Sequence, residues 1–290
     1  HLSLRRQRQM CIRDSVDTVG SEGSMYVRSL AFFLFLALTV SSPAVAQPPD
    51  TVWLDELTWT EVRDKIGDGM TTVIVATAGT EQNGPHMVLG KHKFIIAAAA
   101  EKIGRQLGNA LIAPIVTYVP EGNLNPPSGH MRFSGAITLP NEHFMTLLEF
   151  AARSLAVHGF TDIVFIGDSG GNQRGMEEVS ELLNTEWATE PVRAHFIGDY
   201  YANNGFRQWL ESQGETADDI GSHAGISDTS QLLAVAPQHI RTDKLAPRGG
   251  FDNSGVSGDP TRASAEYGHK GIALKVEAAV KQINDLIDAR

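Results

Sequence analysis

The stretch Val73-Ile-Val-Ala-Thr-Ala-Gly-Thr-Glu81-Gln-Asn-Gly-Pro-His86-Met-Val-Leu-Gly-Lys-His92-Lys93 decides the fold. It opens with apolar, β-branched residues, which are typical of a strand that is buried on both faces. Glycines and a proline between positions 79 and 90 then break the pattern. One carboxylate and two imidazoles therefore follow the carboxyl end of a buried strand, which is where open α/β sheets bind their ligands.

Strands alternate with helices along the rest of the chain. Alternation at this spacing favours parallel strands joined by helical crossovers. The sequence therefore predicts a single α/β domain, with a mostly parallel sheet flanked by helices on both faces. Further strands are predicted at 109–118, 162–166 and 192–197, and helices at 94–107, 142–158, 173–187 and 263–288, the last interrupted at Gly268 and Gly271.

The first 46 residues read as a processing segment. Residues 1–24 show no hydrophobic periodicity and are interpreted as an artefactual extension upstream of Met25. Residues 25–46 combine a positive start, an apolar run at Leu30–Val40 and a final Ala-Val-Ala, which is the pattern of a secretory signal peptide. The apolar run is shorter than the ~20 residues that span a bilayer. We expect the domain, residues 47–290, to be periplasmic or secreted, with no membrane contact after signal cleavage.

Charge and cysteine content exclude several classes of function. The formal net charge is −10, which disfavours nucleic acid and anionic membrane as partners and leaves a small-molecule substrate as the expectation. The single cysteine, Cys11, precedes the predicted domain, so the domain has no disulfide and no thiol chemistry.

Four polar loops are candidates to meet at one edge of the sheet. They span residues 81–92, 129–130, 167–172 and 223–228. Carboxylates and imidazoles gathered at such an edge are the ligands of Zn²⁺ or Mn²⁺. A metal ion there would acidify water and polarise a carbonyl group. The sequence thus indicates a divalent-metal site with an open position for water.

Five motifs, in the same order, resemble those of the creatininase (creatinine amidohydrolase) family. The first, Glu-Gln-Asn-Gly-Pro-His, is similar to the family's Glu-Gln-His-Gly-Pro-His. The resemblance implies hydrolysis of a non-peptide C–N bond in a cyclic amide, a divalent metal, and a homo-oligomer, by family habit a hexamer. The motifs lie at Glu81–His86, Pro127–Ile137, Ile166–Asn172, His223–Ser230 and Gly255–Ala263.

The resemblance carries over to the metal ligands position by position. Glu81 is retained, Asn83 stands where the family has a His, and His92 stands where the family has an Asp that bridges two metals. The family's third-motif His falls on Ser169, one residue after Asp168. A neutral imidazole normally binds one cation, so we predict one Zn²⁺ or Mn²⁺ per chain, held by Glu81, His92 and Asp168.

Alternative ligand sets add His86 or His130, and a lost metal site, with Glu81 in a polar cluster, also stays open. The predicted catalytic residues are His223, which would move a proton to the leaving nitrogen, Asp228, which would tune it, and His130, which the resemblance retains. Asp228 is also suited to cap a helix.

Two further functions compete with the metal-dependent hydrolase. Residues 167–171 match the Gly-x-Ser-x-Gly pattern, which predicts a metal-free serine hydrolase with Ser169 as nucleophile, His223 as base and Asp199 as acid. The other alternative is an exported binding protein or pseudoenzyme that keeps the fold and the pocket without a metal.

Overall fold

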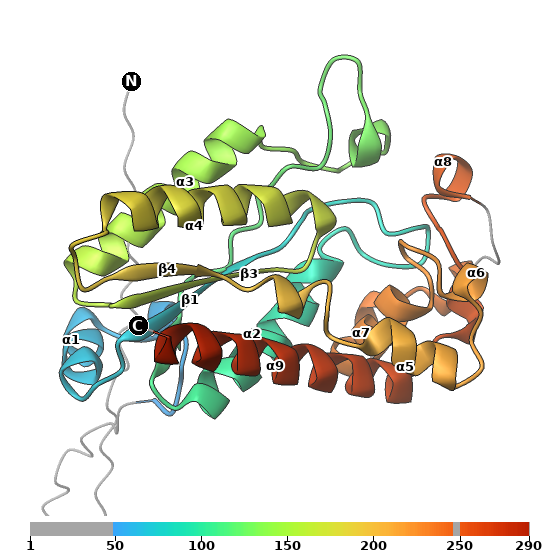
Figure 1. The fold of residues 1–290 in the computed structure, drawn as a ribbon. Helices are drawn as coiled ribbons and strands as arrows, with labels where there is room; N and C mark the ends of the chain where they lie inside the picture. The colour runs from blue at the N-terminus through green and yellow to red at the C-terminus, as the bar shows by residue number, and fades with distance from the viewer. Residues whose placement is uncertain (1–48, 246–249, 290) are drawn as a thin grey trace, which may run out of the picture. The chain divides into compact units, whose positions relative to one another are not determined.

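Four parallel strands form the central sheet of the computed structural model, which describes residues 49–245 and 250–289. The strands are β1 (Thr72–Thr77), β2 (Ala110–Ile112), β3 (Asp162–Gly167) and β4 (Arg193–Phe196), in the spatial order β2-β1-β3-β4 (Figure 1). Residues 47–290 form one compact unit. The predicted extension 1–24 and signal peptide 25–46 lie outside the described residues.

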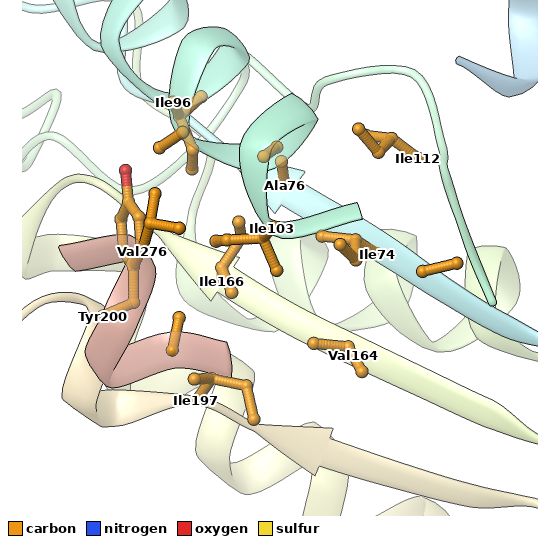
Figure 2. Packing of buried hydrophobic residues seen from close by; sticks show 14 of the residues in the cluster. Ile74, Ala76, Ile96, Ile103, Ile112, Val164, Ile166, Ile197, Tyr200 and Val276 are labelled. Carbon is orange, nitrogen blue, oxygen red and sulfur yellow. The ribbon is translucent and has the colours of Figure 1, made fainter. Parts of the chain in front are cut away.

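Helices cover both faces of the sheet, as the sequence predicts. One face packs against α2 (Lys91–Leu107) and α9 (Ala265–Asp288), and the other against α3 (Asn141–Val157) and α4 (Gln173–Glu186). Alternate residues of β1 point to opposite faces: Ile74 packs with Ile96 and Val276 on the α2–α9 side, as Figure 2 shows, while Val73 packs on the α3–α4 side. The predicted α/β fold class is confirmed.

The second strand is shorter than the predicted 109–118. β2 ends at Ile112, and the following residues touch the sheet only through isolated bridges, one of which joins Val116 to Thr77. Pro114 has no backbone N–H to give to a ladder, so regular pairing stops there.

The remaining helices lie around the carboxyl edge of the sheet or at its opposite end. They are α1 (Trp59–Gly67), α5 (Phe206–Ser212), α6 (Ala217–Ile220), α7 (Ile226–Val235) and α8 (Phe251–Ser254), with short 3₁₀ turns between them. Among the described residues, no helix is long and apolar enough to cross a bilayer.

Two helix boundaries correct the sequence prediction. α9 runs unbroken through Gly268 and Gly271, because both glycines allow close packing: a Cβ added at Gly268 would lie 1.8 Å from the backbone oxygen of Ser230 on α7. α2 begins at Lys91 instead of residue 94, after Gly90. Lys91 and His92 therefore belong to the first turn of a helix and not to the preceding loop.

Candidate active site

A cavity of about 520 Å³ opens where β1 and β3 end. β1 and β3 pair in register up to Thr77 and Gly167, so the segments that follow them leave the sheet side by side. The structure brings all six predicted site residues to this cavity, together with three ionisable residues that the sequence analysis missed. The wall includes Glu81, Lys91, His92, Glu121, His130, Asp168, His223, Asp228 and Lys275.

Glu81 is the carboxylate at the centre of this wall. It is 1% exposed, and its Oε1 lies 2.7 Å from Nε2 of His92 and 3.6 Å from Nζ of Lys91. Burial opposes ionisation, but the neighbouring His92 and Lys91 hold the pKa of Glu81 well below its usual range. Glu81 is therefore an ionised acceptor buried in the cavity wall.

His92 lies between two carboxylates. Its Nε2 faces Glu81, and its Nδ1 lies 2.9 Å from Oδ2 of Asp168. Burial and Lys91 disfavour its charged form, yet the two carboxylates raise the pKa of His92 overall. With both nitrogens facing acceptors, His92 offers no lone pair to a metal ion in this arrangement.

Asp168 is held from the opposite side by a buried lysine. Nζ of Lys275, on α9, lies 2.5 Å from its Oδ1, and the Tyr200 hydroxyl donates to the same oxygen at 3.2 Å. The predicted ligands Glu81, His92 and Asp168 thus form a chain of hydrogen bonds that ends in an ammonium group.

Asp228 lies in the first turn of α7. Its Oδ2 accepts a hydrogen bond from the backbone N–H of Ala224 at 2.7 Å and lies 2.9 Å from Nζ of Lys91. Lys91 outweighs the effect of burial and lowers the pKa of Asp228. Asp228 therefore fixes the start of α7 and holds Lys91, while His223 bonds elsewhere.

His223 has its tautomer set by the backbone. Its Nε2 lies 2.8 Å from the carbonyl oxygen of Gln82, which accepts only from an N–H. Nδ1 therefore carries the lone pair, and it faces Oε1 of Glu81 at 3.7 Å. Burial, reinforced by Lys91, lowers the pKa of His223 to about 4, so the ring is neutral near pH 7.

His130 stands beside His223 on a tightly packed loop. Its backbone N–H donates to the carbonyl of Glu121, and Gly129 before it adopts a left-handed φ of 55°, which favours glycine. The two rings lie 4.7 Å apart, and Nε2 of His130 lies 3.4 Å from Oε2 of Glu81. Burial lowers the pKa of His130.

These two imidazoles and Glu81 form a possible metal site. One ligand atom of each lies within 4.8 Å of the others, the one such group found among the described residues. A carboxylate and two neutral imidazoles suit Zn²⁺ or Mn²⁺. His223 is ready to bind, whereas His130 must first exchange its 3.3 Å contact with the Gln82 amide for a proton on Nδ1. The donor set therefore fits one divalent ion.

Glu121 was missed because it stands alone in a Pro- and Gly-rich loop. It is 4% exposed, and its Oε1 has no hydrogen-bond partner among the described residues. Burial and the charge of Glu81 raise the pKa of Glu121 to about 10. A protonated carboxyl group therefore lines the cavity.

The two buried lysines differ in whether their burial could be predicted from the sequence. Lys275 interrupts the apolar stripe of α9 between Ile272, Val276 and Ala279, and a lysine on such a stripe signals a buried partner. Lys91 carries no comparable signal, because its burial depends on α2 starting earlier than predicted.

Two other residues considered in the sequence analysis are not supported by the structure as a metal ligand or a nucleophile. His86 bonds Thr229 at 3.0 Å and is not part of the cavity wall. Ser169 lines the cavity with an unstrained backbone (φ −127°, ψ 146°), unlike the strained turn of a Gly-x-Ser-x-Gly nucleophile. Among the described residues, no hydrogen bond joins Ser169 to a histidine.

Comparison with known proteins identifies the family of this chain. The profile of the creatininase family, described as creatinine amidohydrolase, matches residues 55–283. A mycofactocin precursor peptide peptidase of Mycolicibacterium smegmatis is 29% identical over 233 residues, covering 73% of this chain and 83% of the relative. A creatinine amidohydrolase of Pseudomonas putida is 23% identical over 200 residues, covering 67% and 76%.

Solved structures show the same fold. A crystal structure of creatinine amidohydrolase superposes with a TM-score of 0.70 at 21% identity, covering 82% of this chain and 98% of that one. Other superposed structures are described as "Creatininase Mn" and as a mutant creatininase of "Zn-Zn type". The five motifs, the matched span and the cavity at the strand ends lead to one conclusion: this chain belongs to the creatininase family and is a hydrolase of that type.

Proposed function

We propose that the protein hydrolyses an amide C–N bond of a small molecule, in a cyclic amide, with one divalent ion held by Glu81, His130 and His223. The observation that carries this proposal is the convergence of one ionised carboxylate and two neutral imidazoles on one cavity. This donor set takes the place of the predicted set, because His92 and Asp168 already bind each other.

The protein side chains divide the work of such a reaction. A divalent ion supplies Lewis acidity to a carbonyl group and acidifies water. The chain Lys275–Asp168–His92 fixes the orientation of the Glu81 carboxylate. Glu121, whose raised pKa keeps its carboxyl group protonated, adds a neutral hydrogen-bonding group to the cavity wall. Water then adds OH to the carbonyl carbon and H to the nitrogen as the C–N bond breaks.

Elemental analysis of the purified protein tests the ligand set. We expect about one Zn or Mn per chain in the wild type and in His143→Ala, an exposed control histidine on α3. His130→Ala and His223→Ala should each lose the ion. If both variants keep it while His92→Ala loses it, the ligand set predicted from sequence replaces the one proposed here.

A panel of five- and six-membered cyclic amides tests the reaction. Hydrolysis adds one water, so the product gains about 18 mass units in mass spectrometry. The gain should disappear after chelation and return with Zn²⁺ or Mn²⁺. A reaction that survives complete removal of metal would contradict the proposal and direct attention to Ser169.

A second candidate is a linear, peptide-like substrate. The relative from M. smegmatis is named a peptidase, and a second hollow of about 250 Å³ lies beside the cavity. The two hollows share five wall residues, so the cleft extends beyond the metal donors: Tyr201, Ser222, His223, Asp228 and Lys275. Short linear peptides belong in the same panel, and their exclusive cleavage would replace the cyclic amide. Export to the periplasm and assembly into a homo-oligomer remain part of this proposal.

A further inference from the structure

Lys91 is a fully buried lysine whose side chain forms part of the cavity wall. Its side chain is 0% exposed, and its Nζ lies 2.9 Å from Asp228 and 3.6 Å from Glu81. Despite these ion pairs, no hydrogen bond of good geometry engages Nζ among the described residues. A buried charge persists only where carboxylates compensate it, so the ammonium belongs to the site and not to the packing alone.

The positions of the lysines decide how many further cations the cavity can take. Beside the protonated carboxyl group of Glu121, three carboxylates line it: Glu81, Asp168 and Asp228. Lys91 serves Asp228 and Glu81, and Lys275 serves Asp168. A first divalent ion can use the Nδ1 lone pair of His223 and, once the proton of His130 moves to Nδ1, the Nε2 of His130, both of which lie within 4 Å of the Glu81 carboxylate. A second ion would find each remaining carboxylate already paired with an ammonium group.

We propose that the Lys91 ammonium is a built-in cation that takes the place of a second divalent ion, so that this chain binds one ion where a two-metal site would bind two. The first ion is the one of the proposed function. The inference rests on that proposal only in counting how many divalent ions each chain binds. The positive charge beside Glu81 also weakens binding of that ion, because like charges repel in a buried site.

Titration of the chelator-treated protein with Zn²⁺ tests this inference. Calorimetry should show one Zn²⁺ per chain for the wild type and for Lys91→Arg, which keeps the charge. Lys91→Met should bind either a second Zn²⁺ or one Zn²⁺ at least ten-fold more tightly. Lys281→Met, an exposed lysine on α9, is the control that leaves binding unchanged.

Folding of the variants is checked by circular dichroism. If Lys91→Met does not fold, Lys91→Gln replaces it, because the amide is polar and can donate to Asp228 without carrying charge. The same increase in Zn²⁺ number or affinity is expected.

The outcomes separate this inference from the proposed function. Two ions in the wild type, or equal number and affinity in Lys91→Met and the wild type, would overturn the role of Lys91 and leave the metal hydrolase intact. If the wild type binds no ion but Lys91→Met binds one, the proposed role of the Lys91 ammonium would be supported and the metal-dependent reaction would be overturned. Binding in neither protein would overturn both.

Discussion

The cavity has two walls that differ in how their polar atoms are satisfied. The helix wall, made of Lys91 and His92 on α2, Lys275 on α9 and Asp168 after β3, has side chains that are at most 9% exposed and joined by ion pairs. The loop wall, made of Glu121, His130 and His223, is more open, with His130 18% exposed. It holds the unpaired oxygen of Glu121 and the lone pair of His223.

This difference separates stability from reactivity. The charged side chains of the helix wall form ion pairs in the protein interior. Removing one of these side chains therefore leaves its partner buried and unpaired. In the loop wall, the Nδ1 lone pair of His223 and Oε1 of Glu121 accept no hydrogen bond from the described residues. Variants of the helix wall should therefore lower the stability of the fold, whereas variants of the loop wall should mainly alter ligand binding.

The largest effect is expected for Lys275→Met. This change leaves the Asp168 carboxylate without its ammonium partner and should lower the free energy of unfolding by ~3–5 kcal/mol. Lys281→Met on the same helix, whose side chain is 75% exposed, should have a much smaller effect, because an exposed ion pair contributes little to stability. Urea unfolding measures both, and similar midpoints for the two variants would remove the distinction between buried and exposed pairs.

The second effect is a pH dependence of the folding stability, which arises from His223 in the loop wall. The pKa of His223 is about 4 in the folded protein and 6.5 as a free side chain. The folded state therefore binds fewer protons between these values, so His223 contributes stability above pH 6.5 that is lost as the pH falls toward 4. This contribution amounts to about 3 kcal/mol.

Chelator-treated wild type and His223→Gln should be compared in urea from pH 4.5 to 7. The wild type should lose stability more steeply than the variant as the pH falls. The lowered pKa values of Glu81 and Asp168 act in the same direction but at lower pH, and they are present in both proteins. Parallel slopes would show that His223 titrates normally and that the loop wall is more solvated than its burial indicates.

The same two walls explain how much could be predicted from sequence. The strands and the helices on both faces follow from hydrophobic periodicity, and the six predicted residues do meet at the strand ends, because motifs after neighbouring parallel strands share an edge. Which of them pair could not be predicted. His92 lies between Glu81 and Asp168 because α2 begins at Lys91. The exact residue at which a helix begins is difficult to predict from local sequence.

The lysines illustrate the limit in a different way. Charge on Lys91 and Lys275 is visible in the sequence, but their burial depends on how α2 and α9 pack against β1 and β3. Burial and proximity to Glu81, which is distant in sequence, raise the pKa of Glu121. Interactions of this kind arise from tertiary packing, so local sequence patterns do not contain them.

A third, smaller effect tests the packing that places the helix wall. Gly268→Ala should favour the helix by ~1 kcal/mol through propensity, yet its Cβ would clash with Ser230, and overpacking costs ~1–3 kcal/mol. We expect net destabilisation, measured as a lower urea midpoint. Gly67→Ala in α1 meets nothing within 4 Å and should be neutral or stabilising. A stabilising Gly268→Ala would mean that α9 shifts freely against α7.

The smallest change in stability is expected for His130→Ala in the absence of metal. The ring has a long 3.3 Å contact with Gln82, a 3.4 Å contact with Glu81 and ring contacts with His223 and Phe251, so its loss should cost less than about 1 kcal/mol. His86→Ala is the matched buried histidine: it lies outside the cavity and bonds Thr229, so its removal should cost about 1–3 kcal/mol.

Zinc binding should reverse this order, because His130→Ala removes a donor and His86→Ala does not. Urea unfolding with chelator and Zn²⁺ titration without it give the two rankings on the same preparations. If His86→Ala weakens Zn²⁺ binding as much as His130→Ala does, the donors extend beyond the loop wall. If His130→Ala proves the less stable of the two, the loop wall is part of the scaffold and the contrast between the two walls is wrong.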